Sequence, residues 1–577
     1  MKGYVNSKVN SAGCGHRLGD DAKERGSLVG ISPAGDRAML LETSSLDQAS
    51  RLFDVLHVAH AEGRFDLPGF GHIEFVAAAR SVLVRGLPSR NWRQFLSMLK
   101  KLQGEAGALQ HDSRVATKTR IDMVYDGEDL AEVASLLGIS RERVVSLHQS
   151  VTYRVAFSGF APGFVYLSGG VHELVVPRRQ VPRIRVRPGS LAIADEFSGI
   201  YPSATPAGWQ IIGHTEHVMW DVTRASPAAL LPGDLVDFVS VRERASLAVR
   251  PAVTAASEQL TPLPDPIGEA VLEVIEPGLR TLVEDGGRVG KAQLGVNVSG
   301  VTDRAAYHVA NDMVGNPSDS PVLELRMGEF RAKALQTVMV ALTGAPRSIQ
   351  VVNGSKTRTE RHYRPFRMDA QEVLVISGTH AGAASMLAVR GGVAATQVLG
   401  SASHDTLSGV GPAPIQRGDV IRRALDRKLS SVSPGIITPP QYPASGDLVT
   451  IRVARGPRES WFSASAVEQF YSSEWQVTPD SDRVGARLHG DPLTRAEAFQ
   501  DRELPTEGIV RGAIQVPTAG QPVIFLADSP LTGGYPAIAV VIEEDLDLVG
   551  QLPPGARVLF TPIDLTNMLT EEVSDEN

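Results

Sequence analysis

Residues 157–167 read FSGFAPGFVYL, a string that sets glycine and proline directly beside aromatic residues. Two further strings of this kind follow: PRRQVPR at 177–183 leads to PGSLAIA at 188–194, and GIYP at 199–202 leads to GWQIIG at 208–213. Glycine at such positions lets the backbone turn a barrel corner or approach a ligand closely. The strings therefore predict short strands and tight turns, whose aromatic side chains either fill a core or line a binding site.

The composition of the whole chain agrees with many short strands. Its 577 residues include 55 glycines and 37 prolines, which is a larger share than the roughly 12% usual in globular proteins. No short repeat or low-complexity tract explains the excess, and glycine- or proline-bearing turns recur every few residues after residue 160. Such spacing favours closed barrels over open sheets.

Charge, cysteine content and hydropathy argue against several classes of protein. The formal net charge of −8 argues against a nucleic-acid-binding protein, which usually carries a basic face. The single cysteine, Cys14, excludes a disulfide framework or a cysteine-based zinc site within one chain. No segment approaches the ~20 apolar residues of a membrane span, and residues 1–25 lack the apolar core of a signal peptide. We therefore expect a cytoplasmic protein with no membrane partner.

Changes in periodicity and composition divide the chain into segments. Residues 1–27 are polar and predict a disordered extension. A capping box from Ser45 to Gln48 precedes apolar residues at helical spacing, and two such helices alternate with strands over 28–105, which predicts a ferredoxin-like α+β layer. The Pro/Ala/Thr-rich run 251–267 predicts a linker. The remaining segments are 112–250, 268–430 and 431–577, the last of which ends in an acidic tail.

Several catalytic motifs are absent from the sequence. The nearest approach to a P-loop is GGRVGKA at 286–292, where the glycine spacing is wrong and Ala292 stands where Ser or Thr would bind magnesium. The run HTEH at 214–217 has the wrong spacing for a zinc-protease helix and favours surface or hydrogen-bonding histidines. No biotin-attachment sequence occurs. ATP or biotin chemistry would therefore place most of its machinery on another chain.

The three aromatic strings resemble a known family pattern. The family is known as the B-type subunit of 5-oxoprolinase, as kinase-autophosphorylation inhibitor or as allophanate hydrolase subunit 1. Its pattern runs F-x-G-F-x-P-G-F-x-Y-L, P-R-x-x-x-P-R, G-S-x-x-I-A and G-I-Y-P-x-x-x-P-G-G-W-x-x-I-G. The match extends upstream from the strings, through Tyr125-Asp126-Gly127 to His148. It departs from the pattern at Val165 and Ala207, where the family has proline and glycine.

The second half of the chain resembles the companion family, known as the C-type subunit of 5-oxoprolinase or as allophanate hydrolase subunit 2. The strongest matching string is GAIQVP at 512–517, followed by GQP at 520–522 and GGYP at 533–536. Shorter pieces also agree, among them Ser481-Asp482-Arg483. This half is the more divergent, since GVGPAP at 409–414 replaces a glycine-rich stretch of the family pattern.

The two resemblances cover roughly residues 28–562 and imply a fold that is mainly β with α+β. They are similar to the carboxyltransferase domain of urea carboxylase, and they imply a ferredoxin-like subdomain C followed by three cyclophilin-like β-barrels. The implied units are subdomain C at 28–105, subdomain D at 112–250, and the tandem barrels of subdomains A and B at 268–430 and 431–577.

The implied chemistry needs a site that holds an amide or lactam beside an anion and excludes water. His148 is either a proton carrier or the C-terminal cap of a helix. The other predicted site residues are anion-clamping arginines, pocket walls, amide-reading side chains and carboxylates that act as acid, base or magnesium-facing groups. They are Arg178, Arg183 and Arg288; Phe160, Gly163, Tyr166, Tyr201, Trp209 and Tyr535; Asn311 and Gln515; and Asp303, Glu324 and Asp528.

Three functions remain open at this point. The resemblance favours an ATP-dependent 5-oxoprolinase that converts 5-oxo-L-proline to L-glutamate with a separate A-type subunit, which would share the binding of ATP and Mg²⁺. The second is the carboxyltransferase component of a biotin-dependent urea or amide carboxylase. The third is a regulatory protein that binds another protein. Fusion implies a fixed interface between the two halves, and a homo-oligomer is compatible with each function.

Overall fold

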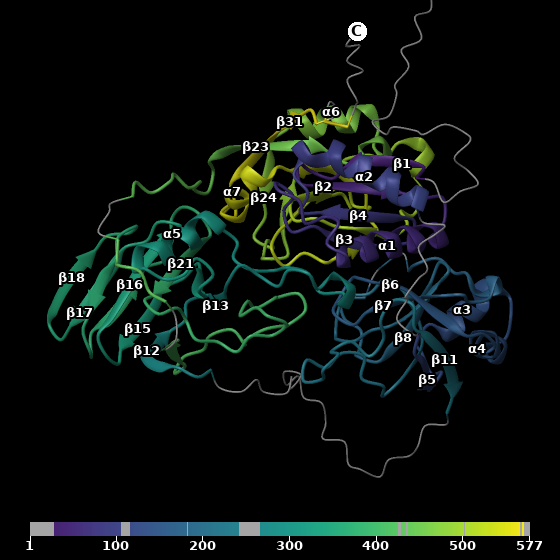
Figure 1. The fold of residues 1–577 in the computed structure, drawn as a ribbon, viewed down its shortest axis with the longest axis horizontal. Coiled ribbons are helices and arrows are strands. Elements are labelled where there is room, and N and C mark those ends of the chain that lie inside the picture. Colours follow the sequence, from purple (N-terminus) through teal and green to yellow (C-terminus); the bar gives the residue numbers. More distant parts are fainter. Residues whose placement is uncertain are drawn as a thin grey trace, which may run out of the picture.

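The computed structural model describes residues 28–105, 116–179, 181, 183–241, 266–424, 428–433, 437–500, 502–565 and 568–569. Four β-rich units follow one another along the chain (Figure 1). The first unit (purple) packs against the fourth (yellow-green), the second (blue) lies below them, and the third (teal) extends to one side (Figure 1). The predicted extension, most of the predicted linker and the acidic tail lie outside the described residues. Within the described residues, no helix is long and apolar enough to cross a membrane.

The first unit is a four-stranded antiparallel sheet with two helices. The order is β1-β2-β4-β3, so β4 lies between β2 and β3, the two strands that α1 connects. This split βαβ arrangement belongs to the ferredoxin-like group, with the additional strand β1 placed first in the chain. Ser45 caps α1 as predicted, because its side chain accepts a hydrogen bond from the Gln48 amide at 3.3 Å. The elements are β1 (Gly30–Pro33), β2 (Ala38–Glu42), α1 (Leu46–Ala61), β3 (Glu74–Ala77), β4 (Ser81–Arg85) and α2 (Trp92–Glu105).

The second unit is a seven-stranded barrel. Its order is β10-β8-β9-β7-β6-β11-β5, and a bridge between Val124 and His214 joins the two edges. Two short helices, α3 and α4, pack against it. The elements are β5 (Lys118–Met123), α3 (Leu130–Leu137), α4 (Arg141–Gln149), β6 (Tyr153–Ser158), β7 (Val165–Ser168), β8 (Ser190–Ala194), β9 (Phe197–Ile200), β10 (Gln210–His214) and β11 (Leu235–Ser240).

The third unit consists of two sheets packed face to face around one apolar core, rather than one continuous barrel. The six-stranded sheet has the order β18-β17-β20-β15-β12-β22, and the five-stranded sheet β13-β14-β21-β16-β19. The elements are β12 (Glu269–Glu276), β13 (Arg280–Glu284), α5 (Arg304–Val314), β14 (Val322–Arg326), β15 (Phe330–Ala334), β16 (Val338–Gly344), β17 (Ile349–Asn353), β18 (Lys356–Glu360), β19 (Phe366–Met368), β20 (Val373–Ile376), β21 (Ala384–Val389) and β22 (Val420–Arg423).

The fourth unit is a closed barrel with the order β23-β30-β27-β28-β25-β24-β31. It repeats the strand order of the second unit, and in both barrels the first and last strands pair in parallel. The elements are β23 (Leu448–Arg455), α6 (Ala464–Ser472), β24 (Trp475–Val477), β25 (Gly485–His489), β26 (Glu507–Gly508), β27 (Ala513–Gln515), β28 (Val523–Phe525), β29 (Thr532–Gly533), β30 (Ala537–Val541), α7 (Leu546–Gly550) and β31 (Arg557–Ile563).

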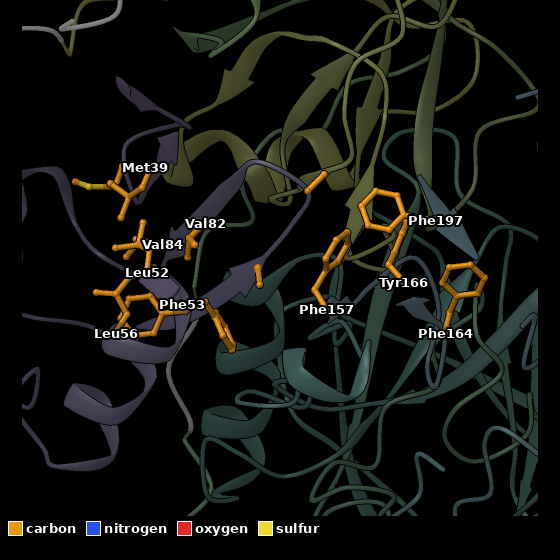
Figure 2. Close-up of a cluster of buried hydrophobic side chains, with 14 of the residues drawn as sticks. Met39, Leu52, Phe53, Leu56, Val82, Val84, Phe157, Phe164, Tyr166 and Phe197 are labelled. Carbon is orange, nitrogen blue, oxygen red and sulfur yellow. The ribbon is translucent and has the colours of Figure 1, made fainter. Parts of the chain in front are cut away.

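The first and second units share one apolar cluster. Figure 2 shows Leu52, Phe53 and Val84 of the first unit near Phe157 and Tyr166 of the second. Burying aromatic and aliphatic side chains stabilises a structure by roughly 1.5–3 kcal/mol for each residue. The aromatic strings of the sequence therefore contribute to a core that joins two units, which was one of the two alternatives left open for them.

Polar contacts tie the fourth unit to the other three. The Ala79 amide of the first unit donates a hydrogen bond to the Thr506 carbonyl of the fourth (3.1 Å). The Phe160 amide of the second unit donates to Thr532 Oγ1 of the fourth (2.9 Å). Arg483 of the fourth unit, a buried arginine, donates to Glu324 of the third. The fusion therefore brings residues of both halves of the chain into common sites.

Candidate functional site

Two of the sequence strings, more than 360 residues apart, meet at one place. Phe160 lies in the turn between β6 and β7 with a φ of 64°, and its amide donates a hydrogen bond to Thr532 Oγ1 at 2.9 Å. The neighbouring Gly159 has no space for a side chain, because a Cβ there would lie 2.4 Å from Thr532 Oγ1. We call this contact between the second and fourth units the motif junction.

Arg178 lies at the motif junction with unused donor capacity. Its Nη2 donates to Thr506 Oγ1 at 3.3 Å, and its Nε lies 3.4 Å from Glu503 Oε2, both at the long end for such contacts. Gly534 allows the guanidinium to approach the backbone, since a Cβ at that position would lie 2.5 Å from Arg178 Nη1. An arginine has five N–H donors. Arg178 can therefore bind an anion through paired hydrogen bonds.

Aromatic side chains of the second unit form a wall behind Arg178. The ring centroids of Tyr166 and Trp209 are 5.4 Å apart, and those of Phe164 and Tyr201 are 5.2 Å apart. Phe160 lies at the edge of this group, with its centroid 6.2 Å from that of Tyr201. Burial raises the pKa of the Tyr201 hydroxyl, which therefore stays protonated and available as a hydrogen-bond donor.

The fourth unit contributes an amide and a more exposed aromatic ring. Gln515 ends β27, and a Cβ at Gly533 would lie 3.4 Å from its Nε2, so the side-chain amide lies against the same loop that touches Arg178. Tyr535 follows in that loop with 37% of its surface exposed. The motif junction therefore gathers one cation, one amide and an aromatic wall, and its predicted members are Phe160, Tyr166, Arg178, Tyr201, Trp209, Gln515 and Tyr535.

A cavity of about 450 Å³ lies beside the motif junction. Residues of three units line it, including Arg80, Asp195, Ser198, Glu503 and Thr506. Burial raises the pKa of the Glu503 carboxyl, although nearby Arg178 acts to lower it. The volume is within the range of small-molecule sites. Glu503, Thr506 and Thr532 were not predicted from the sequence, although each lies close in the chain to a matching string.

Gly163, the remaining predicted wall residue, shapes a turn next to the third unit. Its φ is 76°, and its amide donates to the Leu294 carbonyl at 2.9 Å. A Cβ would lie 3.0 Å from both the Met219 carbonyl and the Trp220 side chain. Glycine is required here for the turn and for close packing.

Arg183 is engaged in an ion pair with Asp129. Its Nη1 and Nη2 donate to the two carboxylate oxygens of Asp129 at 2.8 and 2.6 Å. Asp129 is 2% exposed and also accepts from Arg179 and from the Ile211 amide. Because its paired donors are already used, Arg183 acts as a structural tie, and this placement argues against the predicted role of anion clamp.

Glu324 and Asp528 lie in a buried charge cluster between the third and fourth units. Arg483 is at its centre, with Nη1 2.6 Å from Glu324 Oε1 and Nε 2.8 Å from Asp528 Oδ2, and all three side chains are fully buried. Burial acts to raise the pKa of Glu324 and of Asp528, but the guanidinium outweighs it and both pKa values lie below their ordinary range. Both carboxylates are therefore ionised and already bonded.

Other buried charged residues belong to the same cluster, among them Glu284 and Arg288. Burial raises the pKa of Glu284 well above its ordinary value, which favours the protonated form of this carboxyl. Arg288 is also buried and donates to the carbonyls of Val398 and Ser403. The cluster is separate from the motif junction, so Glu324, Asp528 and Arg288 lie away from the residues gathered there. Arg483 belongs to a string that matches the C-type family pattern, but nothing in the sequence indicated its partners.

Asp303, which caps α5, and Asn311, within that helix, both have structural partners. Asp303 caps the helix by accepting from the Ala306 amide at 2.8 Å, and its other oxygen accepts from Gln551 at 2.8 Å. Asn311 is fully buried; its Nδ2 donates to the Ser320 carbonyl at 2.8 Å. These contacts favour structural roles over the predicted acid/base and amide-reading roles.

His148 is buried inside the second barrel. Its Nδ1 lies 2.9 Å from the Tyr125 hydroxyl and its Nε2 lies 3.0 Å from Ser198 Oγ, while Tyr153 and Phe238 pack on the ring. Burial lowers its pKa to about 3. The ring is therefore neutral near pH 7, which argues against the predicted role of proton carrier.

We expect His148 to make stability depend on pH. Because its folded pKa is depressed from 6.5 to about 3, the unfolded chain binds the extra proton between these values, and stability falls by about 1.4 kcal/mol per pH unit as the pH drops below 6.5. Amide hydrogen exchange in β6 and β11, whose Tyr153 and Phe238 pack on the His148 ring, measures the local stability of wild type and His148→Gln from pH 7.5 to 4.5. The wild type should lose stability faster than His148→Gln, so that the difference in stability between the two proteins narrows as the pH falls. A constant difference would contradict the assignment.

The run from His214 to His217 does not form a metal site in the structure. His214 Nδ1 instead contacts Asp126 Oδ1 at 2.7 Å. Among the residues that the structure describes, no group of three or more His, Cys, Asp and Glu side chains is arranged to hold a metal ion.

Two family models match the chain. The model described as carboxyltransferase domain, subdomain C and D, matches residues 29–231, and the model described as carboxyltransferase domain, subdomain A and B, matches residues 294–562. The first region spans the first unit and most of the second, and the other spans most of the third and fourth. Both families predicted from the sequence strings are therefore present in the predicted order.

Curated relatives agree with this division. The C-type subunit of 5-oxoprolinase from Escherichia coli (strain K12) is 32% identical over 302 residues, which cover 52% of this chain and 93% of that protein. The B-type subunit of 5-oxoprolinase from Escherichia coli O157:H7 is 40% identical over 198 residues, covering 34% of this chain and 84% of that protein. Urea amidolyase of Lachancea kluyveri is 32% identical over 311 residues, covering 50% of this chain and 17% of that protein.

A solved structure resembles nearly the whole chain. The crystal structure of TTHA0988 has a TM-score of 0.75 and 31% sequence identity, and it covers 91% of this chain and 99% of its own. The likeness therefore includes the arrangement in which both halves occur together. The chain belongs to the carboxyltransferase-domain family that includes the B-type and C-type subunits of 5-oxoprolinase, with a B-type half followed by a C-type half in one polypeptide.

Proposed function

We propose that the chain is the fused B- and C-type component of an ATP-dependent 5-oxoprolinase, which opens 5-oxo-L-proline to L-glutamate together with a separate A-type subunit. The observation that carries this proposal is the motif junction, where Arg178 of the B-type half and Gln515 of the C-type half lie at one contact. Relatives of both halves bear the name of the same enzyme.

The chemistry of the motif junction suits this substrate. The molecule 5-oxo-L-proline has one carboxylate, one lactam and a small apolar ring. Arg178 supplies charged, paired donors for the carboxylate, Gln515 supplies a donor and an acceptor for the lactam, and the aromatic wall around Tyr201 covers the ring and limits the access of water. The two halves therefore bind different parts of one molecule.

The proposed reaction divides between this chain and its partner. The lactam C–N bond breaks, water supplies the oxygen of the new carboxylate, and ATP is hydrolysed to ADP and phosphate. In this proposal ATP and Mg²⁺ are bound by the A-type partner or shared with it. The residues of this chain bind and orient the lactam at Arg178 and Gln515.

A second candidate rests on the similarity to urea amidolyase over half of the chain. In that case the motif junction would hold urea or a related amide, and the carboxylate of carboxybiotin would bind Arg178. A biotinylated partner protein would then be required. The two candidates differ in the partner that activates the chain, which can be tested directly.

Reconstitution tests the proposed function. ADP release and glutamate formation from ATP and 5-oxoproline are measured with the chain alone, with a homologue of the A-type component alone, and with both. We expect turnover only in the mixture. No turnover, with the partner shown to bind, would contradict the proposal; a parallel assay with a biotin carboxylase partner and urea then tests the second candidate, and failure of both favours a regulatory role.

A further inference from the structure

A second cavity, of about 360 Å³, lies where the first, third and fourth units meet. It shares no lining residue with the cavity beside the motif junction. One wall comes from the glycine-bearing loop after β13, which includes Gly286, Asn297 and Ser299. The charged lining residues are Asp36, Arg37, Glu74, Arg85, Arg304, Arg511 and Glu543. The cavity therefore exists only where the two halves of the chain are in contact.

Two of the arginines in this cavity are neutralised by neighbours. Arg85 Nη2 lies 2.5 Å from Glu74 Oε2, and Arg85 Nη1 donates to Asn297. Arg304 Nη1 lies 2.8 Å from Glu543 Oε1. These pairs cancel two positive charges with two negative charges, which leaves Arg37, Arg511 and Asp36 to set the net charge.

Arg511 has no carboxylate partner among the described residues. Its Nη2 and Nη1 donate to the backbone carbonyls of Thr302 and Val301 at 2.5 and 3.4 Å, and its buried Nε has no hydrogen-bond partner. Burial, followed by repulsion from Arg304, lowers the pKa of Arg511 to about 10, although Asp547 and Glu543 act to raise it. The side chain remains charged near pH 7, and a bound anion would relieve both effects.

Arg37 and Asp36 add to the positive balance. Within the described part of the chain, no carboxylate lies within ion-pair distance of Arg37. Asp36 accepts a hydrogen bond from the Glu543 amide at 3.0 Å, and burial raises its pKa. With Asp36 ionised, the lining has an excess of one positive charge; protonation of Asp36 would increase the excess to two.

We propose that this cavity binds a phosphate group through Arg37 and Arg511. A phosphate carries about 1.5 to 2 negative charges at pH 7 and has several acceptor oxygens, which match two guanidinium groups that have no ion-pair partner among the described residues. Binding would stabilise the contact between the two halves, because a ligand that binds the assembled form shifts the equilibrium toward it. The inference is independent of the reaction at the motif junction.

Gly286, which lines the cavity, can be substituted without disturbing the fold. It is exposed, its φ is not positive, and a Cβ there would meet no atom within 4 Å. Gly286→Glu adds a negative charge at the cavity, and Gly286→Gln adds the same volume without the charge. Gly378 is also exposed with a non-positive φ, and no lining residue of the cavity is near it in the chain, so Gly378→Glu controls for overall charge.

The test is calorimetric titration of inorganic phosphate into the purified chain alone, at constant ionic strength set with chloride. We expect phosphate-specific binding that Gly286→Glu and Arg37→Gln each weaken about tenfold, the size of one added or removed charge a few ångströms away in a partly solvated site. Gly286→Gln and Gly378→Glu should each change the dissociation constant less than about threefold.

Two outcomes would overturn the proposal: no phosphate binding by the wild type, or equal weakening by Gly286→Glu and Gly378→Glu. Glycerol 3-phosphate distinguishes the source of the group. Tighter binding than inorganic phosphate would indicate a small phosphorylated metabolite, and equal or weaker binding would indicate the free ion; both support the site. Since the titration needs neither a partner nor turnover, its failure is distinct from failure of the proposed function.

Discussion

Arg483→Met is expected to lower the free energy of unfolding of the chain by about 3–5 kcal/mol, because it leaves two ionised carboxylates buried without their cation. Glu324 and Asp528 have no exposed surface, and Arg483 donates to both. Burial alone would raise their pKa values, and the Arg483 guanidinium is the largest of the influences that lower them. The loss should weaken the contact between the third and fourth units.

The stability difference between the wild type and Arg483→Met should depend on pH in a defined direction. In the wild type, the depressed pKa values of Glu324 and Asp528 contribute stability above pH ~4 that is lost as the pH falls through the folded pKa values. In Arg483→Met the same buried carboxylates favour their protonated form, so the penalty is largest near pH 7 and decreases toward acid. The difference between the two proteins should therefore narrow as the pH falls from 7 to 5.

Amide hydrogen exchange in β14 and β25 measures the loss of stability in Arg483→Met locally. A local measurement is preferable because a chain of several units does not unfold in one step. Arg487→Met is the matched control, since Arg487 is on β25 but exposed. Adding Glu324→Gln and Asp528→Asn to Arg483→Met should recover part of the stability by removing the unpaired charges. Equal protection in Arg483→Met and Arg487→Met would contradict the prediction.

The double substitution Arg178→Ala with Gln515→Ala should lower kcat/KM of the reconstituted reaction by about 100-fold, because a charged and a neutral hydrogen bond to the substrate together stabilise it by about 3 kcal/mol. Neither side chain has a short hydrogen bond within the described residues that would be lost with it; the contacts of Arg178 to Thr506 and Glu503 are 3.3 and 3.4 Å long. The thermal unfolding midpoint should therefore stay close to that of the wild type.

Two single substitutions separate a role at the motif junction from a structural one. Arg187→Ala removes an exposed arginine from the same loop and should leave both activity and stability unchanged. Arg183→Ala should lower stability, because it removes a paired contact to the buried Asp129. Full activity of the double variant would remove Arg178 and Gln515 from the proposed site, and a large loss of stability would show that they act in folding.

Much of the local structure was predictable because it depends on neighbours in the chain. The apolar spacing after Ser45 predicted α1, and the structure has both the helix and the cap. The two helices predicted to alternate with strands over 28–105 are also present, as α1 and α2. The strand β1 was missed, because Gly30–Pro33 is short and its pairing with β2 depends on a contact that no periodicity reveals.

The sequence identified the strings that supply the residues of the site, but not how those residues lie relative to one another. The sequence pattern gave Arg178 and Arg183 the same predicted role, that of an anion clamp, since both follow a proline in the same segment. Only the folded chain places Asp129 against Arg183 and Gly534 against Arg178, so that one arginine is paired and the other retains free donors. Such a difference depends on residues that are distant in sequence, and ion pairing is decided by distances of a few ångströms.

The amino-acid sequence alone established the β-rich class, the order of the two halves and the family to which each belongs, because turn residues, apolar spacing and long specific strings are properties of neighbouring residues. The tertiary structure decided which charged groups are neutralised. It paired Arg183 with Asp129 and enclosed Glu324 and Asp528 around Arg483. Burial sets these roles, because a charge removed from water is stable only beside a partner, and the partner is chosen by the fold.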